Sequence, residues 1–235
     1  NHSSAASDVY KRQDPFNPGT ALVSAGGNIP ADCYGDALTF VNNTIAQTNA
    51  YAQVISDAAN AGNNLSSKWN SLTTELSAKL KNVARLISGG LETKVYIVQL
   101  GGFDTHDNQT VDLATDTGIH SDLLLELSDA LCAFQEDLTL LGVDDRVIGM
   151  TYSEFGRRIR SNSALGTDHG DAAPMFMFGS CVENHILGTH PVIDPMVDIE
   201  TGVAMEYDFR DVYGTVLNQW LGLDEADVMN LIYPG

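Results

Sequence analysis

The sequence has little positive charge. Its 235 residues include 12 Lys and Arg against 31 Asp and Glu, which gives a formal net charge of −19 at pH 7. A surface this acidic repels the phosphate backbone of nucleic acids and the anionic face of a membrane. We therefore expect neither of them as a partner, and we expect most of the carboxylates to lie on a solvated surface.

Long apolar runs and cysteines are also scarce. No apolar run approaches the roughly 18 residues of a membrane span, and the longest candidate, residues 172–182, is interrupted by Pro174 and Gly179. The three cysteines are too few and too scattered for a disulfide framework or a cysteine-based zinc site. With 43% hydrophobic residues, the chain is able to bury the core of one sizeable domain or two small ones.

The N-terminus contains an unusual stretch. Residues 3–13, SSAASDVYKRQ, are what a transposase-type sequencing adaptor gives on translation. We therefore expect residues 1–13 to be an adaptor artefact and the natural sequence to begin near Asp14. Residues 14–35 contain several Gly, Pro and Asn and are predicted to be irregular. Residues 36–235 are predicted to be the C-terminal part of a single α/β domain.

Apolar periodicity predicts four helices. They cover residues 36–60, 69–87, 124–141 and 209–221. The second is the clearest, because its apolar residues recur at steps of three and four: Trp69, Leu72, Leu76, Leu80, Val83 and Ile87. Glycines directly after two of these helices, Gly89–Gly90 and Gly142, are typical C-terminal stops.

Three short apolar runs predict buried strands, at residues 94–100, 146–152 and 173–178. Strands that alternate with helices through short connections are typical of a parallel sheet covered by helices. The predicted fold class is therefore α/β, with a mainly parallel sheet flanked by helices.

Polar side chains follow the ends of two of these predicted strands, where ligands bind in open α/β sheets. Asp104 and His106 follow the first strand in GGFDTHDNQ, and Glu154 follows the second in SEFGRR. A loop a few residues further on contains Asp168 and His169 in GTDHG. Mixed histidine and carboxylate sets suit zinc, manganese or iron. The pattern therefore predicts a metal site at one edge of the sheet.

Four segments resemble a known family: VYIVQLGGFDTHDNQ, MTYSEFGRR, GTDHG and DFRDVYGTVLNQWLG. They are similar to the bacterial family called domain of unknown function 1501, which is related to the alkaline phosphatase and sulfatase superfamily. The resemblance covers about Ser67 to Leu223. It implies an alkaline-phosphatase-like fold, incomplete at the N-terminus. It also implies a two-metal site that activates a Ser or Thr nucleophile for attack on a phosphate or sulfate ester.

The resemblance assigns Asp104 and His106 to the first carboxylate and histidine pair. Two alignments compete for the rest. In one, Asp168 and His169 match the superfamily's Asp–His pair. In the other, which we favour because SEFG directly ends a strand, Glu154 takes the place of the carboxylate and His169 is a later third histidine.

Two departures from the superfamily pattern indicate that one metal position is altered or lost. Asp104 and His106 are two residues apart rather than four, and Phe155 stands where a histidine ligand is expected.

The expected metal ligands are Asp104, His106, Glu154, Asp168 and His169. Arg157 and Arg158 are expected either to bind an anionic substrate or to pair with surface carboxylates. His120 and Asn108 are expected to hold the ligands in position, with helix capping as the alternative for His120. Zinc is the expected metal, with manganese, calcium and iron as alternatives. The resemblance places the nucleophile upstream of Asp14.

These observations favour the C-terminal part of an exported, metal-dependent hydrolase of phosphate or sulfate esters, with the fragment inactive by itself. Export is inferred from the family, whose members often begin with a twin-arginine-type signal that this sequence does not include. The alternative is a secreted or cell-surface protein on the same fold that binds without catalysis. A third possibility is a domain that needs a partner chain to complete its site.

Overall fold

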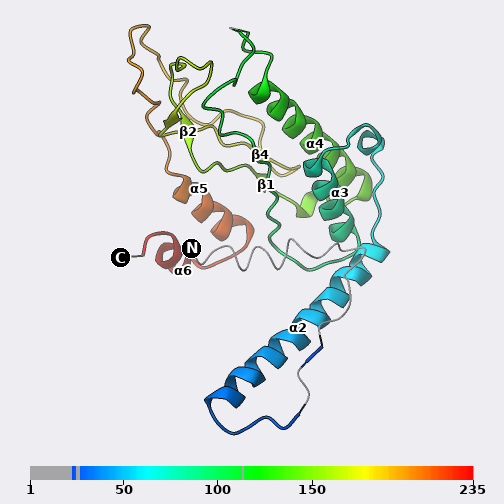
Figure 1. The fold of residues 1–235 in the computed structure, drawn as a ribbon. Coiled ribbons are helices and arrows are strands. Elements are labelled where there is room, and N and C mark those ends of the chain that lie inside the picture. The colour runs from blue at the N-terminus through cyan, green and yellow to red at the C-terminus, as the bar shows by residue number, and fades with distance from the viewer. Residues whose placement is uncertain (1–22, 25–26, 113, 235) are drawn as a thin grey trace. The chain divides into compact units, whose positions relative to one another are not determined.

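The structure, a computed structural model, describes residues 23–24, 27–112 and 114–234 (Figure 1). The expected adaptor residues 1–13, and the expected irregular segment up to residue 22, lie outside this part. The chain divides into two compact units, which are described separately. The first comprises residues up to Gly101 together with Leu123–Ile148. The second comprises Gly102–Asp122 and Gly149–Gly235.

The first unit is helical. Its helices are α2 (Cys33–Ala61), the 3₁₀ turn η1 (Ser67–Ser71), α3 (Glu75–Ser88), most of α4 (Ile119–Leu141) and the 3₁₀ turn η2 (Asp144–Arg146). Polar side chains cap the N-terminal ends of two of these helices. The Asp32 carboxylate accepts from the Gly35 amide at the start of α2, and the Thr74 hydroxyl accepts from the Ser77 amide at the start of α3. Each satisfies an amide that the first turn of a helix leaves unpaired.

Two glycines allow α2 and α3 to meet at their C-terminal ends. A Cβ added to Gly62 would lie 1.8 Å from the Arg85 carbonyl oxygen, and one added to Gly89 would lie 1.9 Å from that of Ala58. Only glycine permits this approach of two backbones. Ala58, Ala59 and Leu86 form a small apolar cluster beside the contact.

A buried carboxylate connects α4 to the segment that precedes α3. Asp137 is fully buried, and its oxygens accept from the backbone amides of Leu65 at 2.5 Å and Ser66 at 2.8 Å. They also accept from Asn64 Nδ2 at 2.7 Å and from Trp69 Nε1 at 2.8 Å. Four donors on one carboxylate satisfy a charge that burial would otherwise make very costly.

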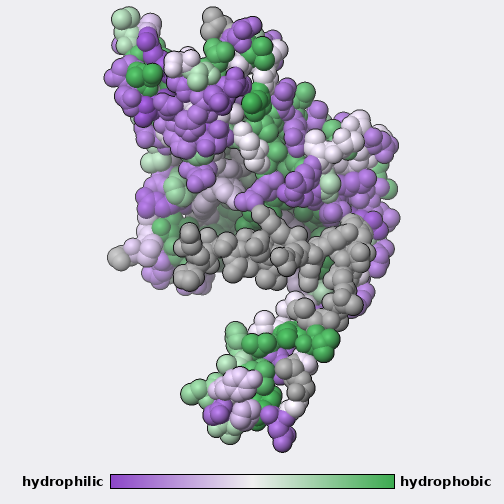
Figure 2. All heavy atoms as spheres, in the orientation of Figure 1, coloured by the Kyte–Doolittle hydropathy of each residue, from purple (hydrophilic) through white to green (hydrophobic). Residues whose placement is uncertain are grey.

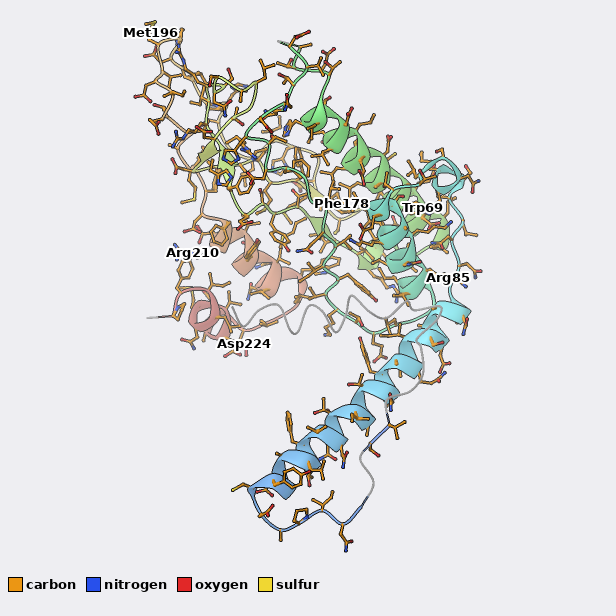
Figure 3. The ribbon with its side chains drawn as sticks, in the orientation of Figure 1. Trp69, Arg85, Phe178, Met196, Arg210 and Asp224 are labelled. Atoms are coloured by element: carbon orange, nitrogen blue, oxygen red, sulfur yellow. The ribbon has the colours of Figure 1, made fainter. Side chains whose placement is uncertain are left out.

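The second unit contains short strands and a C-terminal helical segment. Strand β1 (Gly149–Met150) pairs antiparallel with β4 (Met177–Phe178), and β2 (Gly156–Arg157) pairs antiparallel with β3 (His169–Gly170). The C-terminal elements are α5 (Phe209–Thr215), the π-helical turn η3 (Val216–Trp220) and α6 (Glu225–Ile232). The loop between β4 and α5 extends outward to Met196 (Figure 3).

The predicted parallel sheet is wrong. Within the described residues, the strands form only two antiparallel two-stranded sheets, and helices are the commoner regular structure. Residues 94–100 do not belong to any strand, and Val95 and Ile97 are 62% and 71% exposed. An apolar β-branched run favours an extended backbone, but a strand also requires a neighbour that pairs with its amides and carbonyls. The local sequence does not encode that neighbour.

The predicted helices agree better with the structure. Residues 36–60, 124–141 and 209–221 fall in α2, α4 and the α5–η3 segment. The prediction for residues 69–87 is wrong in one respect, because Trp69 lies in η1 and the helix begins only at Glu75. The Thr74 cap separates the two parts although the apolar spacing continues through it.

Some apolar side chains of the first unit face solvent. Figure 2 shows hydrophobic residues at the surface of α2, where Phe40 is 72% exposed. Among the described residues no helix is both long and apolar enough to cross a bilayer. The three cysteines, Cys33, Cys132 and Cys181, are exposed and free.

Candidate metal site

Three of the five predicted ligands converge in the second unit. Oδ1 of Asp104 lies 2.7 Å from Nε2 of His169 and 2.9 Å from Nδ1 of His106. One ligand atom from each residue lies within 4.8 Å of the other two, and the two imidazole rings are 4.7 Å apart between centroids. All three side chains are exposed. This set therefore presents three donor atoms with an open side.

Glycines bring the two ligand-bearing segments together. A Cβ on Gly166 would lie 2.2 Å from the carbonyl oxygen of His106, and one on Gly170 would lie 2.5 Å from that of Arg157. His169 stands opposite Arg157 in the β2–β3 pair. Both glycines of the GTDHG motif thus permit close backbone contacts with segments that contain other site residues. The sequence motif alone did not reveal this role.

Side-chain hydrogen bonds fix the same two segments to each other. Gln109 Oε1 accepts from the hydroxyls of Thr105 at 2.9 Å and Thr167 at 2.7 Å. Asn162 Nδ2 donates to the carbonyl oxygen of His106 at 2.7 Å and to Asp168 Oδ1 at 3.1 Å. Asn162 was not among the residues expected from the sequence, and the only available signal for it was a polar side chain near the GTDHG motif.

The two arginines expected to bind substrate have protein partners. Arg157 donates to the carbonyl oxygens of Thr167, at 2.5 Å, and Phe103, and its Nη2 lies 3.4 Å from Asp104 Oδ1. Arg158 lies 2.5 Å from Glu200 Oε2. Arg157 thereby connects Phe103, which precedes Asp104, with Thr167, which lies two positions before His169.

The other two predicted ligands are not part of the three-residue group. Asp168 is held by Asn162, and its Oδ2 lies 3.7 Å from Arg158 Nη1. Glu154 is exposed at a bend of the chain. Among the described residues, the only group of three or more ligand-type side chains close enough to hold one ion is Asp104, His106 and His169.

Phe155 packs directly against a candidate ligand. Its ring is stacked on the His169 imidazole with 3.8 Å between centroids and 8° between planes. The Arg157 guanidinium carbon lies 4.8 Å from the centroid of the same Phe155 ring. The resemblance led us to expect a metal ligand at position 155. The chain instead has an aromatic ring there, in contact with the candidate ligand His169.

The two expected supporting residues contact residues other than the candidate ligands. The His120 ring meets Phe103 edge to face at 5.9 Å, its buried Nδ1 has no partner, and burial is the main cause that lowers its pKa. Asn108 donates its backbone amide to the Ala164 carbonyl at 3.0 Å and has φ of 49°. Asparagine adopts this left-handed conformation more readily than most residues.

The electrostatics of Asp104 suit a metal ligand. The hydrogen bond from His169 is the main cause that lowers the pKa of Asp104, and the charges of His106 and Arg157 lower it further. An ionised carboxylate and neutral imidazoles are the forms that bind metal. Two histidines and one carboxylate with open positions form a donor set found at zinc and non-haem iron sites.

A family model described as protein of unknown function, DUF1501, matches residues 52–230. This chain belongs to the DUF1501 family. The match includes every candidate site residue of this DUF1501 protein, and it confirms the family that the sequence motifs indicated. Among curated proteins and solved structures, none matches the chain.

Proposed function

We propose that Asp104, His106 and His169 of this DUF1501 protein bind a divalent metal ion for the hydrolysis of phosphate or sulfate esters. The observation that carries the proposal is the convergence of one carboxylate oxygen and two imidazole nitrogens within 4.8 Å. Two nitrogens and one oxygen favour zinc. Manganese and iron accept the same donors, whereas calcium prefers a shell of oxygens.

The bound ion would polarise an ester oxygen and stabilise the charge that develops during its cleavage. The protein's own residues supply the positioning. Arg157 and Asn162 hold the backbone on either side of the ligands, and the exposed side of the cluster leaves room for a substrate.

Metal binding is tested by titrating the metal-free chain with Zn²⁺ and Co²⁺ in a calorimeter. Wild type is expected to bind, and His106→Ala and His169→Ala are expected to lose binding. His190→Ala is the matched control, because this exposed histidine lies outside the three-residue group and its Nδ1 contacts the Pro191 carbonyl oxygen. Equal binding by all four proteins would reject the ligand assignment.

Hydrolysis is tested separately with p-nitrophenyl phosphate and p-nitrophenyl sulfate. The assay uses the product of the parent gene, as the source organism makes it, as well as this chain. Activity that disappears with a chelator and in His169→Ala supports the proposal. Export is a further part of it, tested by locating the parent gene product in cell fractions.

A non-catalytic metal-binding protein is the second candidate. The observation in its favour is that the Arg157 donors reach backbone carbonyls, so that its guanidinium holds the site together. Metal binding without hydrolysis in the parent gene product would favour this function over the first.

A further inference from the structure

The His169 imidazole is held from two directions. Its Nε2 contacts Asp104 Oδ1 at 2.7 Å, and its face lies on the Phe155 ring. The side chain is otherwise open, with 46% of its surface exposed. A histidine ring rotates over a broad range about its last torsion, so an exposed imidazole needs a contact that fixes its plane.

The contact with Asp104 is a poor means of fixing that plane once a metal is bound. The same Asp104 oxygen that faces His169 is a candidate ligand atom, so a metal competes with this hydrogen bond. The stack with Phe155 involves no ligand atom, so a metal does not compete with it. It is therefore the contact that orients His169 in both states.

Phe155 is itself attached to a well-defined part of the second unit. Its carbonyl oxygen accepts from the Ser153 hydroxyl at 2.8 Å, and the next residue, Gly156, pairs with Gly170 in the β2–β3 sheet. The Arg157 guanidinium lies over its ring. The ring and the imidazole thus project from two paired strands and their immediate neighbours.

We propose that Phe155 is a positioning residue for metal binding, whose ring fixes the plane of the His169 imidazole so that Nε2 stays directed at the point shared with Asp104 and His106. This inference rests on the proposed function in one respect, that His169 is a metal ligand. The stack itself is a property of the metal-free protein.

The experiment compares wild type with Phe155→Leu, Phe155→Trp and the control Phe176→Leu, an exposed phenylalanine of the same unit. Affinities for Zn²⁺ and Co²⁺ are measured by titration, together with the visible absorption of the Co²⁺ form. Phe155→Leu is expected to bind about tenfold more weakly and to change the Co²⁺ spectrum. Phe155→Trp, which keeps a flat ring, and Phe176→Leu are expected to bind like wild type.

A second readout needs no metal. In the NMR spectrum of the metal-free protein, the ring current of Phe155 should shift the His169 ring protons upfield. The shift should disappear in Phe155→Leu and persist in Phe176→Leu. Circular dichroism of each variant identifies any general loss of folding, and if Phe155→Leu is unfolded, Phe155→Met replaces it.

The outcomes separate the two proposals. Wild type that binds neither metal contradicts the metal site, and the NMR shifts then decide alone whether Phe155 positions His169. Wild type that binds while Phe155→Leu binds equally well, with an unchanged Co²⁺ spectrum, overturns the role of Phe155. Weaker binding in Phe155→Leu with recovery in Phe155→Trp establishes it.

Discussion

Gly166 lies against the backbone of His106 so closely that a Cβ at position 166 would be 2.2 Å from the His106 carbonyl oxygen. The segment with His169 and the segment with Asp104 and His106 can therefore meet only if residue 166 has no side chain. The candidate metal site therefore depends on a residue, Gly166, that has no side chain to bind the metal.

Replacing Gly166 with alanine is expected to separate the two segments and weaken Zn²⁺ binding by about tenfold, comparable to the loss of a residue that orients a ligand. Titration calorimetry measures the affinity. The control is Gly101→Ala, because a Cβ on Gly101 meets nothing within 4 Å. Wild-type affinity in Gly166→Ala would show that the ligands assemble without this contact.

Replacing Asp137 with alanine is expected to lower the free energy of unfolding by about 3 kcal/mol, because four donors lose their buried acceptor at once. Urea denaturation gives the value. Asp129→Ala removes an exposed carboxylate from the same helix α4 and should change stability little. Similar losses in both variants would contradict the role assigned to Asp137.

The α2–α3 contact makes Gly89 sensitive to any side chain. Gly89→Ala places a methyl group 1.9 Å from the Ala58 carbonyl oxygen, and we expect a loss of about 2 kcal/mol from the forced separation of the helices. Gly90→Ala meets no atom but strains a left-handed residue, for a smaller cost of about 1 kcal/mol. A thermal melt of both variants checks this order, and the reverse order would contradict it.

The pH prediction concerns Glu136, whose pKa is lowered mainly by the hydrogen bond from Lys68 and also by that from Ser66. A lowered carboxyl pKa stabilises the folded state above the ordinary pKa, and the contribution is lost as the pH falls through the folded value. Lys68→Met should therefore raise the pKa of Glu136, as measured by carbon NMR titration. Lys79→Met, whose lysine pairs with Glu75, should leave it unchanged, and an equal rise in both variants would reject Lys68 as the cause.

The helices could be predicted from the sequence because their signals are local. The Leu76 and Leu80 spacing and the stop at Gly89 lie within one segment, and the structure reproduces them. Thr74 was missed as a cap because the apolar spacing runs across it. The sheet could not be predicted, because the partner of Gly149–Met150 is 27 residues away and antiparallel.

The site could be predicted only in part, because it also depends on contacts between segments that are distant in the sequence. Asp104 and His106 are near each other in the sequence, whereas the approach of His169 depends on Gly166, Gln109 and Arg157, whose contacts no motif encodes. Glu154 and Phe155 are adjacent at a bend just before β2, where no strand alternation fixes which side chain points toward the site. The sequence could not show that Phe155, rather than Glu154, faces His169.

The exposed run at residues 94–100 has a consequence for handling the protein. No hydrogen bond between two backbone groups joins residues 92–102 to another described residue, and Val95 and Ile97 face solvent. The Gln99 carbonyl oxygen accepts from the Lys79 side chain, at 3.5 Å. Such a segment is a template for strand addition between molecules. The −19 charge keeps molecules apart at low ionic strength. At 0.1 M salt the screening length falls to about 10 Å, so salt removes the colloidal barrier that keeps these segments from meeting.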